Sequence, residues 1–109
     1  VLGGDFNATL VARGGDAANR EALRDLGLVS AYHAFHGIAH GGEPHPTYRH
    51  GVDRREWHID FCFVPVAWAD RIRAVEVRRD VIEAGVSDHA ALVVDVDVDP
   101  APRVRPTSA

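Results

Sequence analysis

The sequence contains a single cysteine, Cys62, and no methionine. One cysteine excludes an internal disulfide, and it also excludes the cysteine clusters that bind structural zinc. It slightly favours a cytoplasmic location. Because the sequence opens on the strand-like residues Val1 and Leu2 with no preceding methionine, we expect the natural protein to have further residues upstream.

Long apolar runs and an excess of basic charge are also missing. No run approaches the ~20 apolar residues that cross a bilayer, so we expect no membrane span. The net charge is −4, which is not the basic footprint of a free-standing nucleic-acid binder. With 109 residues and 46% hydrophobic content, the composition is that of one small globular domain.

Apolar periodicity predicts an α/β chain that is dominated by strands and has one clear helix. Apolar residues at helical spacing predict a helix over residues 17–26, with Asp16 as its N-cap and Gly27 as its C-cap. Alternating or continuous apolar residues predict strands over residues 1–6, 57–64, 71–78 and 91–97. Imperfect alternation within residues 71–78 indicates a bulge.

The remaining segments lack a sustained period. Residues 31–53 are rich in His, Gly and Pro and are predicted to be a long loop, with a short strand at 47–49. Residues 99–109 are punctuated by proline and are predicted to be a disordered tail. Residues 1–98 would therefore form the folded part.

Polar residues interrupt the first strand at its end. In Gly3-Gly4-Asp5-Phe6-Asn7, Asp5 and Asn7 are two residues apart and project to the same side. A carboxylate at this place could take a proton from a water nucleophile, and the amide could orient a phosphoryl oxygen. The alternative is an ordinary turn, in which Asp and Asn are common.

Asp60 stands in the middle of an otherwise aromatic and apolar strand. Alternation places Ile59, Phe61 and Phe63 on one face and Asp60 on the other. An unpaired carboxylate in such a strand is costly, so Asp60 must have a partner. One of Arg49, Arg54 and Arg55 could supply it, or a histidine whose tautomer Asp60 would fix.

Ser87-Asp88-His89 immediately precedes the last strand. Neighbouring side chains at a strand entry point in different directions, so Asp88 could bind a hard cation while His89 faces a phosphate. An ordinary turn would explain the same residues.

Together and in this order, the segments Gly4-Asp5-Phe6-Asn7-Ala8, Ile59-Asp60-Phe61 and Ser87-Asp88-His89 resemble the C-terminal motifs of the endonuclease/exonuclease/phosphatase superfamily. This family includes DNase I-like nucleases, abasic-site endonucleases, sphingomyelinases and inositol phosphatases. The resemblance covers residues 1–98. It implies the C-terminal half of a DNase I-like four-layer α/β sandwich, contributing one mainly antiparallel sheet and its covering helix.

The resemblance also implies roles. Asp5 would be the general base, and Asn7 would bind the phosphate. Asp60 would pair with His89, which contacts the scissile phosphate. Asp88 would help to hold the divalent cation, Mg²⁺ or in its place Mn²⁺.

Two departures from the family pattern bear on this interpretation. His58 stands where many members have an arginine, which could change a surface or substrate contact. The family's asparagine and glutamate metal ligands lie in an N-terminal half that this sequence does not contain. We therefore expect the chain to need that half, and to be inactive alone.

The histidines of the middle segment invite a zinc interpretation. They match neither C-x₂-C nor H-E-x-x-H spacing, which favours a solvated loop on the substrate side over a metal site. Within that loop, Pro46-Thr47-Tyr48 resembles a segment that many relatives carry, which would place Thr47 at the substrate. The histidines concerned are His33, His36, His40, His45 and His50.

The predicted function is hydrolysis of a phosphoester, with nucleic acid, phospholipid and inositol phosphate as substrate classes that this scaffold accommodates. The alternative is a remnant or binding domain that keeps the fold without catalysis.

Overall fold

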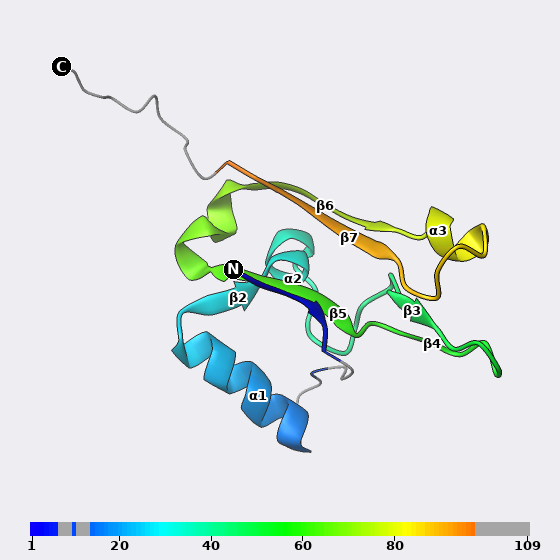
Figure 1. Ribbon diagram of the computed structural model, residues 1–109. Coiled ribbons are helices and arrows are strands. Elements are labelled where there is room, and N and C mark those ends of the chain that lie inside the picture. Colours follow the sequence, from blue (N-terminus) through cyan, green and yellow to red (C-terminus); the bar gives the residue numbers. More distant parts are fainter. Residues whose placement is uncertain (7–9, 11–13, 98–109) are drawn as a thin grey trace.

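A three-stranded antiparallel sheet is centred on β5 (Asp60–Pro65) in the computed structural model, which describes residues 1–6, 10 and 14–97. Strand β1 (Leu2–Asp5) pairs with one edge of β5, and β2 (Leu28–Ser30) pairs with the other (Figure 1). Strands β1 and β5 confirm two of the predicted strands.

Two further antiparallel ladders complete the strands. The short β3 (Tyr48–Arg49) pairs with β4 (Glu56–Trp57), and β6 (Ile72–Arg78) pairs with β7 (Ala91–Val96). The predicted bulge is confirmed as a register shift between Ile72 and Ala74. The expectation of one sheet is wrong for the described residues, because β4 and β5 are separate strands and their ladders do not join.

Helix α1 (Gly14–Asp25) is the predicted helix, but it begins earlier than its sequence pattern suggests. Asp16 therefore lies within the helix and not at its N-cap. The C-terminal prediction is confirmed: Gly27 follows the helix with a φ of 81°, and its N–H donates to the carbonyl of Arg24 at 2.8 Å. Glycine adopts this left-handed conformation without steric cost.

The segment predicted as a long loop contains a second helix, α2 (Ala31–His36). Ser30 is its N-cap and accepts from the backbone N–H of His33, and Gly37 ends it with a φ of 66°. Six residues are too few to show a helical period, which is why the pattern missed α2. The 3₁₀ helix η1 (Val66–Arg71) and the one-turn α3 (Asp80–Glu83) were missed for the same reason.

The core has two parts, on opposite faces of β5. Phe61 and Phe63 pack with Leu10 and with the partly buried Leu23 of α1. Val64, on the other face, belongs to a cluster between α2, β5 and β6, whose buried members are Ala31, Tyr32, Val64, Ile72 and Val75. Figure 1 shows α1 on the opposite side of the β5 sheet from the β6–β7 hairpin.

These elements make a small α/β domain with antiparallel sheets, as predicted at that level. In the part of the chain that the structure describes, none of the helices has both the length and the apolar character needed to cross a membrane. The tail predicted over residues 99–109 lies outside the described residues.

Candidate active site

Asp5 and Asp60 lie directly opposite each other on neighbouring antiparallel strands. Residues in register project to the same face, so two carboxylates meet at the end of β1. Like charges in this position repel each other and destabilise the pair unless a cation or a proton lies between them. The site therefore begins with two acidic groups that need a third group.

His89 supplies that third group. Its Nδ1 lies 2.9 Å from Oδ2 of Asp60, and its Nε2 lies 3.5 Å from Oδ2 of Asp5. Partial burial alone would lower the pKa of His89, but the hydrogen bond that its ring donates to Asp60 and the charges of Asp60, Asp5 and Asp88 outweigh it and raise the pKa. The imidazole thus lies between two carboxylates that favour its protonated form.

The segment before β7 carries His89 to this place through backbone bonds to the β3 segment. Arg49 N–H donates to the carbonyl of Asp88 at 2.9 Å, and Ala90 N–H donates to the carbonyl of Thr47 at 2.7 Å. Tyr48 forms an isolated antiparallel bridge with His89, and their ring centroids are 4.8 Å apart. Three successive residues thereby fix the backbone on both sides of the imidazole.

Thr47 also holds Asp60. Its hydroxyl oxygen accepts from the N–H groups of Ile59 (3.0 Å) and Asp60 (3.1 Å). Its exposed fraction is 0%, so the side chain cannot contact a substrate in this structure. The expectation that Thr47 binds substrate is therefore corrected: its hydroxyl is used inside the fold to position Asp60, while its carbonyl positions the His89 segment.

Asp88 lies at the edge of the group. Its side chain is 62% exposed, and its Oδ1 lies 4.0 Å from His89 Nε2. Ser87 closes the turn by accepting from the N–H of His89 at 3.1 Å. Asn7, which sequence analysis placed at the phosphate, lies outside the described residues.

Two of the three arginines proposed as partners for Asp60 are engaged elsewhere. Arg49 binds Glu56 at 2.9 Å and Glu83 at 3.0 Å. Arg55 binds Asp53 at 3.1 Å. The sequence left either an arginine or a histidine as the partner of Asp60, and the structure shows a histidine, His89.

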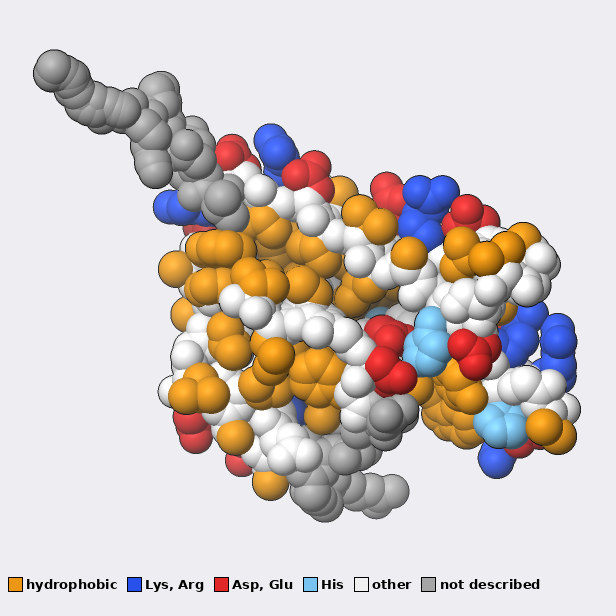
Figure 2. All heavy atoms as spheres, in the orientation of Figure 1, with side chains coloured by type: hydrophobic (Ala, Val, Ile, Leu, Met, Phe, Trp, Pro, Cys, Tyr) orange, Lys and Arg blue, Asp and Glu red, His pale blue; other side chains and the backbone are white. Residues whose placement is uncertain are grey.

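A shallow hollow of about 270 Å³ borders Asp60. Gly3, Gly4, Ala90 and Leu92 are among its lining residues. Gly4 has a φ of 136°, a conformation that side-chain-bearing residues rarely adopt. Figure 2 shows acidic side chains around a histidine on the exposed face where β1 ends and β7 begins. The group is accordingly open to solvent on one side.

Asp5, Asp60 and His89 offer ligand atoms that all lie within 4.8 Å of one another. Carboxylate oxygens are the ligands that Mg²⁺ prefers, and three acidic residues surround this imidazole. The set is compatible with a divalent cation but is not specific for one. Asp88, the predicted ligand, is not a member of this set, and its Oδ1 lies 4.0 Å from Nε2 of His89.

Two expectations about histidines are corrected. His58 is 4% exposed, and its Nδ1 lies 2.8 Å from the carbonyl of His45, so it makes no surface contact. His33, expected in a solvated loop, is buried in α2. The sequence does not predict the burial of these histidines, because the spacing of its residues does not show that α2 forms.

Comparisons with protein-family models, with curated proteins and with solved structures found no match.

Proposed function

We propose that this chain is the C-terminal half of an endonuclease/exonuclease/phosphatase domain, and that it supplies the proton-transfer and phosphate-binding side of a metal-dependent phosphoester hydrolase. The observation that carries the proposal is the Asp5–His89–Asp60 array. Its members come from three segments that are far apart in the sequence, and these are the segments that carry the family resemblance.

In this proposal Asp60 is a positioning residue. An ionised carboxylate only accepts hydrogen bonds, so its contact with Nδ1 fixes that nitrogen as the donor. His89 Nε2 then faces the open side, where a protonated ring would stabilise negative charge on a phosphate. Asp5 lies beside Nε2 and would take the proton of the attacking water. Asn7 would bind a phosphoryl oxygen, as the resemblance implies.

Asp88 and Asp5, whose carboxylate oxygens both lie near Nε2 of His89, would hold the Mg²⁺ or Mn²⁺ ion. When bound, such an ion polarises the phosphoryl oxygen and stabilises the leaving oxygen. The remaining ligands would come from the N-terminal half of the domain. All residues of strand β1 are exposed, which leaves a surface there that the N-terminal half could cover.

The substrate would be a phosphoester of nucleic acid, phospholipid or inositol phosphate. The net charge of −4 gives this part of the protein little attraction for a polyanionic backbone. Binding would therefore depend on the cation and on local contacts to the reacting phosphate.

The test is hydrolysis of a panel of phosphoesters in the presence of Mg²⁺, by the 109-residue chain and by the longer natural polypeptide that the proposal implies. We expect activity only from the longer protein. His89→Ala and Asp5→Ala should each lower kcat/KM by about 100-fold or more, as is usual for groups that transfer protons. DNA, RNA, sphingomyelin and inositol phosphates form the panel.

His50→Ala and Asp53→Ala are matched controls, because they alter another His–Asp pair, with a contact of 3.2 Å, that is exposed and lies in the loop after β3. Both should keep full activity. Unchanged turnover in both site variants would sink the role assignments. A longer protein that hydrolyses none of these substrates would favour the alternative, a binding domain that keeps the fold without catalysis.

A further inference from the structure

A second group of ligand-type side chains lies away from the Asp5–His89–Asp60 array. Asp60 and Phe61 are neighbours on β5, so they project to opposite faces. The rings of His33 and His40 pack on Phe61, each with a centroid distance of 6.0 Å. This second group is therefore separate from the candidate active site.

Three residues of α2 and the loop after it make up the group. His33, His40 and Glu43 offer ligand atoms within 4.8 Å of one another. Nε2 of His33 lies 2.6 Å from Oε2 of Glu43, and each of these side chains is only 6% exposed. The rings of His33 and His40 are stacked with centroids 3.7 Å apart. Two imidazoles and a carboxylate thus converge in a mostly buried place.

The orientation of His33 is set by a neighbour outside the group. Its Nδ1 lies 2.6 Å from the hydroxyl of Ser30, the N-cap of α2. Histidines that bind metals hold their second ring nitrogen in such a hydrogen bond, which directs the other nitrogen to the ion. Gly41 N–H likewise donates to Glu43 Oε2 at 3.1 Å and holds the carboxylate in place.

Buried nitrogen atoms here lack protein partners. Within the described residues, Nδ1 of His40 is buried with no hydrogen-bond partner, and so is Nε2 of His58. The His58 ring lies 5.6 Å from that of His33. Buried polar atoms are rarely left unpaired, and each such atom needs an explanation. A bound cation would provide one for His40.

The charge states of the group suit a cation. Burial, helped by the charges of His33 and Arg20, lowers the pKa of His40 to about 4, so its ring is neutral at pH 7. Burial alone would raise the pKa of Glu43, but hydrogen bonds from His33 and Gly41 outweigh it and lower the pKa to about 2. A neutral imidazole and an ionised carboxylate are the protonation states that bind metals.

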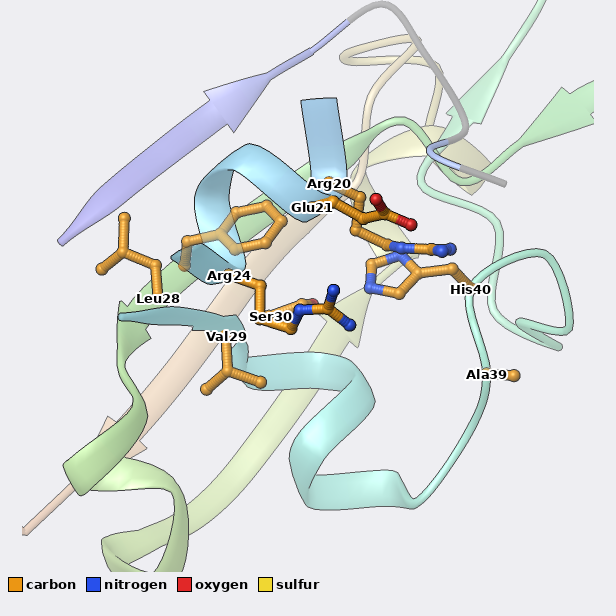
Figure 3. Close-up of a pocket in the computed structure, with 9 residues that line it drawn as sticks. Arg20, Glu21, Arg24, Leu28, Val29, Ser30, Ala39 and His40 are labelled. Atoms are coloured by element: carbon orange, nitrogen blue, oxygen red, sulfur yellow. The ribbon is translucent and has the colours of Figure 1, made fainter. Parts of the chain in front are cut away.

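Solvent reaches the group through a pocket of about 450 Å³ between α1, β2 and the loop that carries His40. Figure 3 shows Arg20 and Arg24 of α1 extending over this pocket toward His40. Ser30, which holds His33, also lines it. An ion could therefore enter without unfolding of the core.

We propose that His33, His40 and Glu43 form a binding site for a divalent transition-metal ion of the zinc class. Two histidines and a glutamate are an established zinc ligand set, with Zn–N bonds of about 2.0–2.1 Å and room for a water as fourth ligand. Imidazole nitrogen also favours Zn²⁺ over Mg²⁺.

Binding requires a small local change. Ligand atoms on one tetrahedral ion lie about 3.3–3.5 Å apart. His33 and Glu43, now 2.6 Å apart, must therefore separate slightly, and His40 must tilt out of its stack on His33 to direct a nitrogen at the same ion. The ion replaces the hydrogen bond between His33 Nε2 and Glu43, and His33 binds as a neutral ring that carries its one proton on Nδ1, where the Ser30 hydroxyl accepts it. The spacing of the three residues matches neither zinc motif considered in the sequence, so only the fold reveals the set.

The test is titration of the metal-free chain with Zn²⁺ by calorimetry, and with Co²⁺ by visible absorption. We expect one equivalent to bind, and an intense Co²⁺ spectrum of the kind that tetrahedral sites give. His40→Gln and Glu43→Gln should each weaken Zn²⁺ affinity by at least about 10-fold, since even the loss of an outer-shell partner costs that much. His50→Ala should bind as the unchanged chain does.

Asp60→Asn distinguishes this site from the candidate active site, and it should leave Zn²⁺ affinity unchanged. Nuclear magnetic resonance of the unchanged chain provides a check that needs no variant: one equivalent of Zn²⁺ should shift the ring signals of His33 and His40 but not those of His89. The proposal is overturned if no single equivalent binds, if both glutamine variants bind normally, or if Asp60→Asn abolishes binding instead.

Discussion

His89 lies between Asp60 and Asp5, with Nδ1 2.9 Å from the first carboxylate and Nε2 3.5 Å from the second. Because the two aspartates are opposite each other on neighbouring strands, the imidazole reduces a repulsion that the sheet itself creates. The contact thus serves the fold as well as the chemistry proposed for it.

Asp60→Asn should lower the pKa of His89. The variant removes the charge and the strongest acceptor that oppose the effect of burial on the ring. A pH titration of the ring signals by nuclear magnetic resonance measures this change. Asp95→Asn, which alters an exposed aspartate paired with Arg73, is the control and should leave the pKa of His89 unaltered. An unchanged pKa in Asp60→Asn would mean that the pairing does not exist in solution.

Thr47→Val should destabilise the protein by about 2–4 kcal/mol. The valine keeps the shape but leaves the N–H groups of Ile59 and Asp60 without their acceptor, at about 1–3 kcal/mol for each buried donor. Urea denaturation measures the loss. Thr47→Ser keeps the hydroxyl and removes one methyl group, so it should cost only about 1 kcal/mol. A Thr47→Val variant that is no less stable than Thr47→Ser would show that the two N–H groups do not depend on the hydroxyl.

The sequence predicted the parts of this fold that repeat with a regular period. Phe61 and Phe63 lie on the strand face that alternation assigned to them and are both buried, and Gly27 follows α1 as its pattern required. Local residue patterns decide these features, so they are legible without tertiary contacts. The missed helix α2 depends instead on a cap at Ser30 and on the burial of Tyr32, which no pattern within six residues can show.

The candidate site was predictable in composition but not in geometry. The sequence indicates Asp5 and His89 as polar residues beside strand ends, and Asp60 as a carboxylate within an apolar strand. The sequence could not say that Asp5 and Asp60 share a register, because register depends on how β1 and β5 align. The resemblance of Pro46-Thr47-Tyr48 to a family segment placed Thr47 at the substrate, whereas its contacts with Asp60 and Ala90 join residues that are distant in the chain.

Glu56→Ala should loosen the β3–β4 hairpin by about 1 kcal/mol. Glu56 Oε2 lies 2.9 Å from Arg49 Nε and 2.6 Å from Arg79 Nη2, so one carboxylate links β3, β4 and the start of α3. Such networks exceed the small contribution of isolated surface pairs. Hydrogen exchange of the hairpin amides and urea denaturation measure the effect. Glu76→Ala removes a single exposed contact of 4.0 Å with Arg78 and should be near neutral.

The free energy of unfolding should decrease as the pH falls, because of His40 and Glu43. The ordinary pKa of a histidine is 6.5, but the pKa of His40 in the folded chain is about 4. Burial, together with the charges of His33 and Arg20, disfavours the protonated ring. Below pH 6.5 the unfolded chain therefore binds a proton that the folded chain does not. This contribution is fully present above pH 6.5 and is lost as the pH falls toward 4. Glu43 also contributes stability that is lost as the pH falls from 4.5, its ordinary pKa, to about 2, its pKa in the folded chain.

His40→Gln should flatten the upper part of this dependence, because glutamine does not titrate. Thermal midpoints measured by circular dichroism from pH 7.5 to pH 4.5, with a chelator present, separate this effect from metal binding. His89 has the opposite sign: its raised pKa stabilises the fold at low pH, and that contribution is lost as the pH rises through the folded pKa. The difference between the unchanged chain and His40→Gln cancels the His89 contribution. Parallel curves would therefore show that His40 is solvated, and the buried cluster would then be absent in solution.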